Sequence, residues 1–333
     1  MNKSTIYWGD VNKYLHDVIV NLDCEQIFLL VDENTQRHCL PHLDLREFHI
    51  IKIPSGEAHK NIETCQAIWA NLLDKKATRK ALLINLGGGV IGDMGAFCAA
   101  SFKRGIFFIN IPTTLLAMVD ASIGGKAGVD FMNQKNMIGL FVNPIATIID
   151  PIFLQTLPTR HIQSGKAEML KHGLIYNLQH FQHIQLEGIP DLDQIKESVM
   201  IKKYFVEADP FDRNLRQNLN FGHTIGHAIE STALSKDEDL LHGEAVGKGM
   251  MVELKLSTLY GGLDKKEADG YIDKLAEFFG ETKYSEQDLK EWIEWASNDK
   301  KNESNQLSFS LLNQGGKVEN NIKLTLKDIL QIL

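Results

Sequence analysis

The stretch Ala81-Leu82-Leu83-Ile84-Asn85-Leu86 is an apolar run of strand length, and Gly87-Gly88-Gly89-Val90-Ile91-Gly92-Asp93 follows it directly. A strand that passes through glycines into a helix is typical of nucleotide-binding folds, because the backbone can then approach a pyrophosphate at the helix N-terminus. The acid expected about 20 residues after G-x-G-x-x-G is missing, since Ile109 and Asn110 lie there. Asp32, after an earlier strand, could replace it, and a plain glycine-rich turn is the alternative reading.

Strands and helices alternate on both sides of this stretch through the first 150 residues. Apolar strands are predicted at 26–32 and 48–54, and a helix at 63–74, so a parallel sheet with crossover helices is expected. From about residue 151 the pattern changes to long amphipathic stretches, at 164–185, 192–207, 223–233, 243–260, 265–279 and 286–296. One strand, at 307–312, leads into a predicted hairpin turn at 313–316. We therefore expect a Rossmann-like α/β domain at 1–150 and a mainly α-helical domain at 151–333.

The composition excludes several classes of protein. With 333 residues, 44% hydrophobic and a net charge of −8, the chain is an ordinary globular protein without a basic surface for nucleic acid. Its four cysteines lack C-x-x-C spacing and are predicted to be reduced thiols. The N-terminus has no apolar signal segment, and the most apolar stretch, 106–119, is too short to span a membrane. We expect a cytoplasmic protein.

Two groups of residues indicate binding chemistry. Gly124-Gly125-Lys126 predicts an anion site, since backbone amides and an ammonium can converge there, although a solvated lysine is the alternative. His223 and His227 lie on one face of a predicted helix, and His242 follows. Two histidines and one carboxylate with an open fourth position make up a catalytic zinc site. Glu168, His223 and either His242 or His227 would supply it, whereas buried structural histidines and a surface Glu168–Lys171 ion pair remain alternatives.

In order and spacing, these segments resemble the 3-dehydroquinate synthase family across nearly the whole chain. The segments that carry the resemblance are 87–93, 111–126, 135–136, 156–158, 167–171, 215–230, 241–244 and 316–317. The resemblance implies NAD, a zinc (or cobalt) ion, a homodimer, and a lyase that makes 3-dehydroquinate and phosphate from 3-deoxy-arabino-heptulosonate 7-phosphate. The implied steps are oxidation by NAD, β-elimination of phosphate, reduction, ring opening and intramolecular aldol closure.

The resemblance also assigns roles to individual residues. The implied metal ligands are Glu168, His223 and His242. The implied catalytic residues are Asp120, Lys126, Lys171, Lys202, Arg216, Asn220 and His227. Substrate binding is assigned to Arg104, Asn136 and Lys317, with Arg104 reaching into the partner subunit's site. NAD binding is assigned to Asp32, Asn34, Glu57, Lys60, Gly88, Gly89, Asp93, Thr113, Thr114, Lys126, Lys135 and Thr156.

The chain departs from the family pattern in four places. Asp212 replaces a glutamate, Arg213-Asn214 replaces small residues, Lys166 replaces an apolar residue, and the loop at 230–242 is slightly long and acidic. Other readings are a different sugar-phosphate cyclase of the 2-deoxy-scyllo-inosose synthase type, a metal-dependent polyol dehydrogenase, or a non-enzymatic nucleotide- or metal-binding protein. Arg216 and Lys202 favour a carboxylated substrate and so the first reading.

Overall fold

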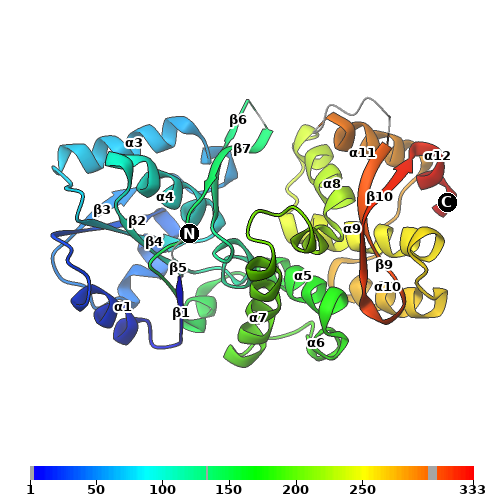
Figure 1. The fold of residues 1–333 in the computed structure, drawn as a ribbon, viewed down its shortest axis with the longest axis horizontal. Coiled ribbons are helices and arrows are strands. Elements are labelled where there is room, and N and C mark those ends of the chain that lie inside the picture. Colours follow the sequence, from blue (N-terminus) through cyan, green and yellow to red (C-terminus); the bar gives the residue numbers. More distant parts are fainter. Residues whose placement is uncertain (1–3, 133, 299–305) are drawn as a thin grey trace. The chain divides into compact units, whose positions relative to one another are not determined.

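The computed structural model describes residues 4–132, 134–298 and 306–333, which form two compact units (Figure 1). The N-terminal unit comprises Met1–Pro158 together with Asp191–Val199, and the helical unit comprises Thr159–Pro190 and Met200–Leu333. The domain boundary that we expected at residue 150 stays a prediction.

A six-stranded parallel sheet forms the centre of the N-terminal unit. Its strands are β1 (Thr5–Trp8), β2 (Gln26–Val31), β3 (Phe48–Lys52), β4 (Ala81–Gly87), β5 (Phe107–Pro112) and β8 (Ala146–Ile149), in the order β1-β8-β5-β4-β2-β3. Every pair in this sheet is parallel, which confirms the predicted Rossmann-like class. The chain order reverses between β2 and β4, and ligands of open α/β sheets bind beyond the strand ends at such a point. The predicted glycine turn follows β4.

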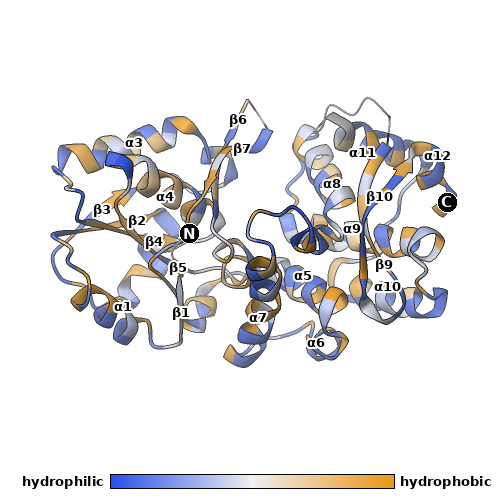
Figure 2. Cartoon of the chain, viewed as in Figure 1, coloured by the Kyte–Doolittle hydropathy of each residue, from blue (hydrophilic) through white to orange (hydrophobic). Residues whose placement is uncertain are grey.

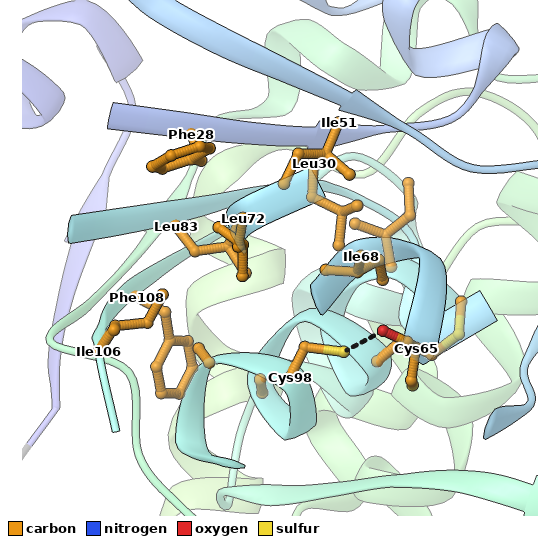
Figure 3. Close-up of a cluster of buried hydrophobic side chains, with 14 of the residues drawn as sticks. Phe28, Leu30, Ile51, Cys65, Ile68, Leu72, Leu83, Cys98, Ile106 and Phe108 are labelled. Atoms are coloured by element: carbon orange, nitrogen blue, oxygen red, sulfur yellow. Dashed lines mark hydrogen bonds between the residues drawn. The ribbon is translucent and has the colours of Figure 1, made fainter. Parts of the chain in front are cut away.

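Helices α1 (Val11–Val20), α2 (Glu33–His38), α3 (Ile62–Asp74) and α4 (Gly89–Ser101) connect these strands. Apolar and polar residues alternate along α1 and α3 in Figure 2, as expected for helices that cover a sheet. Figure 3 shows one core, in which Phe28 and Leu83 of the sheet face Ile68 of α3 and Cys98 of α4. All of β4 is buried, because both of its faces are covered. A hairpin of β6 (Lys126–Phe131) and β7 (Gln134–Phe141) completes the unit.

The helical unit contains α5 (Thr159–Tyr176), α6 (Leu178–His183), the C-terminal half of α7 (Leu192–Ala208), α8 (His223–Ser235), α9 (His242–Leu256), α10 (Lys265–Phe279), α11 (Glu286–Asn298) and α12 (Leu326–Ile329). An antiparallel hairpin joins β9 (Gln306–Leu312) to β10 (Val318–Thr325) through the predicted turn.

The amphipathic stretch at 164–185 contains parts of two helices. The first helix ends after Tyr176, and Asn177 begins α6 by accepting hydrogen bonds from the N–H groups of Gln179 and His180. Gly173 allows the two helices to approach, since a Cβ there would lie 2.5 Å from the backbone N of Phe181. The stretch at 243–260 is also not one α-helix, because α9 ends at Leu256 and a π-helix continues from Ser257 to Gly261.

Candidate active site

Helix α5 is almost entirely buried although its sequence is not apolar. Its buried residues include Lys166, Glu168, Lys171 and His172. Burying charge is costly unless the groups are paired, so such a helix marks a functional region. The Lys171 ammonium contacts Glu168 Oε2, and both side chains are buried. The alternative of a surface ion pair between these two residues is therefore wrong.

Three histidines converge beside Glu168. Ring nitrogens of His223, His227 and His242 lie within 4.8 Å of one another. The Nε2 atoms of His223 and His242 lie 3.4 and 3.9 Å from the same carboxylate oxygen, Glu168 Oε1. Ligands about 2.0–2.1 Å from a tetrahedral zinc ion lie roughly 3.4 Å from one another, so these donors fit a divalent ion. The structure thus brings together the three predicted ligands and also His227.

His223 is the first residue of α8, and a buried acid fixes that helix end. The N–H groups of Gly222 and Ile225 donate to Glu253 Oε2 (2.7 Å) and Oε1 (3.1 Å). Gly222 adopts a positive φ of 79°, and a Cβ there would lie 2.4 Å from Met250 Cγ. Burial raises the pKa of Glu253 to about 8, although backbone N–H groups of Ile225, Gly222 and Thr224 act in the opposite direction. The only sequence signal for Glu253 is an acid inside an apolar helix.

His242 begins α9, and an arginine of α5 fixes this second helix end. Arg160 donates from Nε to Glu244 Oε1 (2.6 Å) and from Nη2 to Glu244 Oε2 (2.7 Å). Glu244 also accepts the Leu241 N–H at 2.8 Å. Helices α5 and α9 touch directly beside His242, because the Gly243 N–H donates to Ser164 Oγ at 3.1 Å. Arg160 was missed by the sequence reasoning.

Two further predicted cations of the helical unit, Lys202 and Arg216, are buried. Arg216 Nη1 donates to the Pro210 carbonyl at 3.0 Å. Asp209 organises this loop by accepting N–H groups of Arg213, Asn214 and Arg216. Burial pushes the pKa of Asp209 upward, but these hydrogen bonds outweigh it and the pKa is lowered. The loop that contains the unusual residues Asp212 and Arg213-Asn214 is therefore held in place by hydrogen bonds to Asp209.

The other predicted residues of this unit, Asn220 and Lys317, are exposed. Asn220 ends a short helix, Leu215–Asn220, that is tied to the β9–β10 hairpin by a hydrogen bond from Ser310 Oγ to the Gln217 carbonyl (2.9 Å). Lys317 follows the hairpin turn, which packs on α5, since a Cβ at Gly316 would lie 3.1 Å from the Leu174 carbonyl.

In the N-terminal unit, the predicted nucleotide residues gather at the carboxyl ends of β2 and β4. Gly88 precedes α4, and a Cβ there would lie 3.2 Å from Thr114 Cγ2. The Thr113 N–H donates to the Gly87 carbonyl at 3.0 Å. Asp32 follows β2 and caps α2, where its Oδ1 accepts the Thr35 N–H at 2.7 Å.

A buried lysine joins several of the predicted residues into one network. Lys60 Nζ lies 2.6 Å from Asp93 Oδ2 and 2.7 Å from Asn136 Oδ1. Glu57 Oε1 lies 3.9 Å from Lys60 Nζ and 3.8 Å from Lys135 Nζ. The structure therefore brings four of the predicted NAD residues, Glu57, Lys60, Asp93 and Lys135, together with Asn136, which the resemblance assigns to the substrate.

Two neighbouring cavities open beside the glycine turn, with about 240 and 220 Å³ of empty space including their mouths. Gly92, Asn110, Ala121 and Ser122 line both, and Lys126 and Asp93 line the larger one. Predicted residues that line neither cavity include Arg104, Asn34 and Thr156, all exposed, and Asp120, within the π-helix Ala117–Ala121.

Comparison with known proteins decides the family. Residues 50–164 match the model described as 3-dehydroquinate synthase N-terminal, and residues 165–302 match 3-dehydroquinate synthase C-terminal. A 3-dehydroquinate synthase of Parabacteroides distasonis is 39% identical over 334 residues, covering 97% of this chain and 95% of that protein. The chain belongs to the 3-dehydroquinate synthase family. Another 3-dehydroquinate synthase, from Sulfurovum sp., is 40% identical over 276 residues, covering 82% and 78% of the two chains.

Solved structures of two other enzymes share the fold. A 2-deoxy-scyllo-inosose synthase in complex with carbaglucose-6-phosphate, NAD+ and Co2+ has a TM-score of 0.82 at 22% identity, covering 98% of this chain and 95% of that one. A 2-epi-5-epi-valiolone synthase from Streptomyces hygroscopicus, with NAD+ and Zn2+ bound, also has a TM-score of 0.82, at 23% identity and with 100% and 96% coverage. Within the part of the chain that the structure describes, no helix is long and apolar enough to cross a membrane.

Proposed function

We propose that the chain is a 3-dehydroquinate synthase, a lyase that converts 3-deoxy-arabino-heptulosonate 7-phosphate into 3-dehydroquinate and phosphate. The observation that carries the proposal is the convergence of Glu168, His223 and His242 in a chain 39% identical to a 3-dehydroquinate synthase over nearly its full length. The proposed cofactors are NAD and a divalent metal ion, zinc or cobalt, and the proposed setting is a cytoplasmic homodimer with Arg104 reaching the partner's site.

When bound, the metal ion would polarise a substrate hydroxyl, and NAD would accept and return a hydride. The chain's own residues hold and orient these groups. Lys171 contacts one oxygen of Glu168, which leaves the other oxygen facing His223 and His242. The buried cations Lys202 and Arg216 are suited to a carboxylate, because a desolvated cation binds an anion more strongly than an exposed one does.

The remaining predicted roles are proposed for each unit separately. On the helical unit, Asn220, His227 and Lys317 would contact the substrate. On the N-terminal unit, the glycine turn at Gly88-Gly89, together with Asp32, Lys60 and Asp93, would bind NAD at the carboxyl ends of the strands. The same proposal covers Asn34, Glu57, Thr113, Thr114, Lys135 and Thr156 for NAD, and Asp120, Lys126 and Asn136 for the substrate.

The test is to incubate the protein with the heptulosonate phosphate, zinc and a trace of NAD, and to follow phosphate, 3-dehydroquinate and NADH. We expect phosphate and 3-dehydroquinate in equal amounts and no net NADH. Stoichiometric NADH without phosphate would identify a polyol dehydrogenase, and absence of any turnover with this substrate would reject the proposal in favour of another sugar-phosphate cyclase or a binding protein.

Replacing His223 tests the metal site directly. His223→Ala should lose bound metal and activity while its circular dichroism spectrum is retained. The matched control is His16→Ala, which removes an exposed histidine whose side chain is 75% accessible and should leave both properties unchanged. Full activity of metal-free His223→Ala would contradict the assignment.

A further inference from the structure

The two predicted histidine ligands use their ring nitrogens in the same way. His223 Nδ1 lies 3.3 Å from the Phe221 carbonyl oxygen, and its Nε2 lies 3.4 Å from Glu168 Oε1. His242 Nδ1 lies 3.3 Å from Glu230 Oε2, and its Nε2 lies 3.9 Å from the same Glu168 oxygen. Each ring therefore has an acceptor on its Nδ1 side and the buried carboxylate on its Nε2 side.

With a metal ion on the Nε2 side, the contacts on the Nδ1 side are the ones that hold the remaining ring hydrogens. A carbonyl oxygen can only accept, so the Phe221 carbonyl accepts the Nδ1–H of His223 when Nε2 is a ligand. An ionised carboxylate also only accepts, so Glu230 accepts the Nδ1–H of His242 in the same way. Both Nε2 atoms then lie on the side of Glu168 Oε1, where the ion would be held.

Glu230 is placed so that it links two helices at the site. It lies on α8, one turn after His227, whereas His242 begins α9. Its side chain is nearly buried, at 10% exposure, so its charge is poorly screened by water. Glu168 already contacts the Lys171 ammonium, whereas the carboxylate of Glu230 adds negative charge directly behind the His242 ring.

We propose that Glu230 is a positioning residue of the metal centre, which accepts the Nδ1–H of His242 and so directs the Nε2 lone pair at a divalent ion. This rests on the proposed function only to the extent that the site holds such an ion. Carboxylates in this position fix ring orientation and raise the basicity of the ligand, and their loss typically costs 10–100-fold in metal affinity.

Two substitutions separate orientation from charge. Glu230→Ala removes the acceptor, whereas Glu230→Gln keeps an amide oxygen that accepts the same hydrogen but carries no charge. Zinc and cobalt affinity is measured on the purified full chain by competition with a chromophoric chelator. We expect a 10–100-fold loss of zinc affinity for Glu230→Ala. Glu230→Gln should restore part of this loss, because its amide oxygen still accepts the Nδ1–H.

The matched control is Glu244→Gln, which removes a carboxylate two residues from His242 that contacts Arg160 and the Leu241 N–H. It should lower stability and cost less zinc affinity than Glu230→Ala does. Equal losses of zinc affinity in Glu244→Gln and Glu230→Ala would overturn the proposal, because helix placement would then explain both. Zinc affinity of Glu230→Ala within threefold of wild type would also overturn it. Wild-type protein that binds zinc but releases no phosphate would reject the proposed reaction and leave this inference standing.

Discussion

Substitution of Glu253 by glutamine should change how the stability of the helical unit depends on pH. The carboxyl group is fully buried, and its pKa is about 8 in the folded protein, against an ordinary value of 4.5. Between these values the folded chain holds a proton that the unfolded chain releases. The stabilisation from this group is therefore fully present below pH 4.5 and is lost as the pH rises through 8.

The size of the effect follows from the same two values. Stability should fall by about 1.4 kcal/mol for each pH unit inside the window, so about 4 kcal/mol is lost between pH 5 and pH 8. Glutamine occupies the same space and keeps one acceptor for the N–H groups of Gly222 and Ile225, but it does not titrate. The difference between wild type and Glu253→Gln isolates this group from the other titratable groups of the chain.

The assay is urea unfolding of chelator-treated protein at half-unit steps from pH 5 to pH 8.5. Trp292 is a suitable reporter, because it packs in the same cluster as Ile225. The other three tryptophans, Trp8, Trp69 and Trp295, are therefore replaced by phenylalanine in both proteins. We expect the free-energy difference to slope across the window and flatten above pH 8. Parallel curves for the two proteins would refute the reasoning and mean that the α8 N–H groups keep Glu253 ionised.

Three other substitutions test separate contacts. Lys166→Met should lower the free energy of unfolding by a few kcal/mol, because the buried ammonium donates to the carbonyls of residues 185–188 at 2.8–3.2 Å. Lys290 is exposed, so Lys290→Met should have little effect in the same urea titration. Gly243→Ala should lower the free energy of unfolding by about 2 kcal/mol and weaken zinc binding, because its Cβ would lie 1.9 Å from the backbone oxygen of Ser164. The control Gly270→Ala has nothing within 4 Å of its Cβ and should be stabilising. Equal stability of the two variants would contradict the packing argument. Lys60→Met should weaken NAD binding tenfold or more in a fluorescence titration while zinc affinity stays constant. Unchanged NAD affinity would show that the contacts of Lys60 with Asp93 and Asn136 do not contribute to nucleotide binding.

Sequence periodicity identified the long elements and missed the short ones. Strands β1 and β8 have four residues each, too few for alternation to be distinguished from a loop. Strand β5 was not predicted, because its run was considered only as part of the apolar stretch at 106–119, although Pro112 ends the strand. The helix break at Asn177 had one local signal, an asparagine suited to a helix N-cap, whereas the close packing of Gly173 against Phe181 is visible only in the structure.

The candidate site was predictable where residue type alone indicates chemistry. Histidine spacing placed His223 and His227 on one face of α8, and Glu168 was a plausible third donor. The residues that fix the helix ends were not predictable, because Arg160 and Glu244 are 84 positions apart and Glu253 and Gly222 are 31 apart. Carboxylates and arginines are common on helices, and only the fold distinguishes those that support a ligand from those that face solvent.

The division of the chain into units has a consequence for its synthesis. The N-terminal unit includes Asp191–Val199, and Leu192 packs beside Gly9, near the start of the chain. At about 5–20 residues per second, this segment leaves the ribosome roughly two to eight seconds after Pro158. While α5 and α6 of the other unit are translated, the nascent N-terminal unit is therefore incomplete, and the surface that this segment covers is exposed. A fragment that stops at Pro158 would lack this segment permanently and should be prone to aggregation.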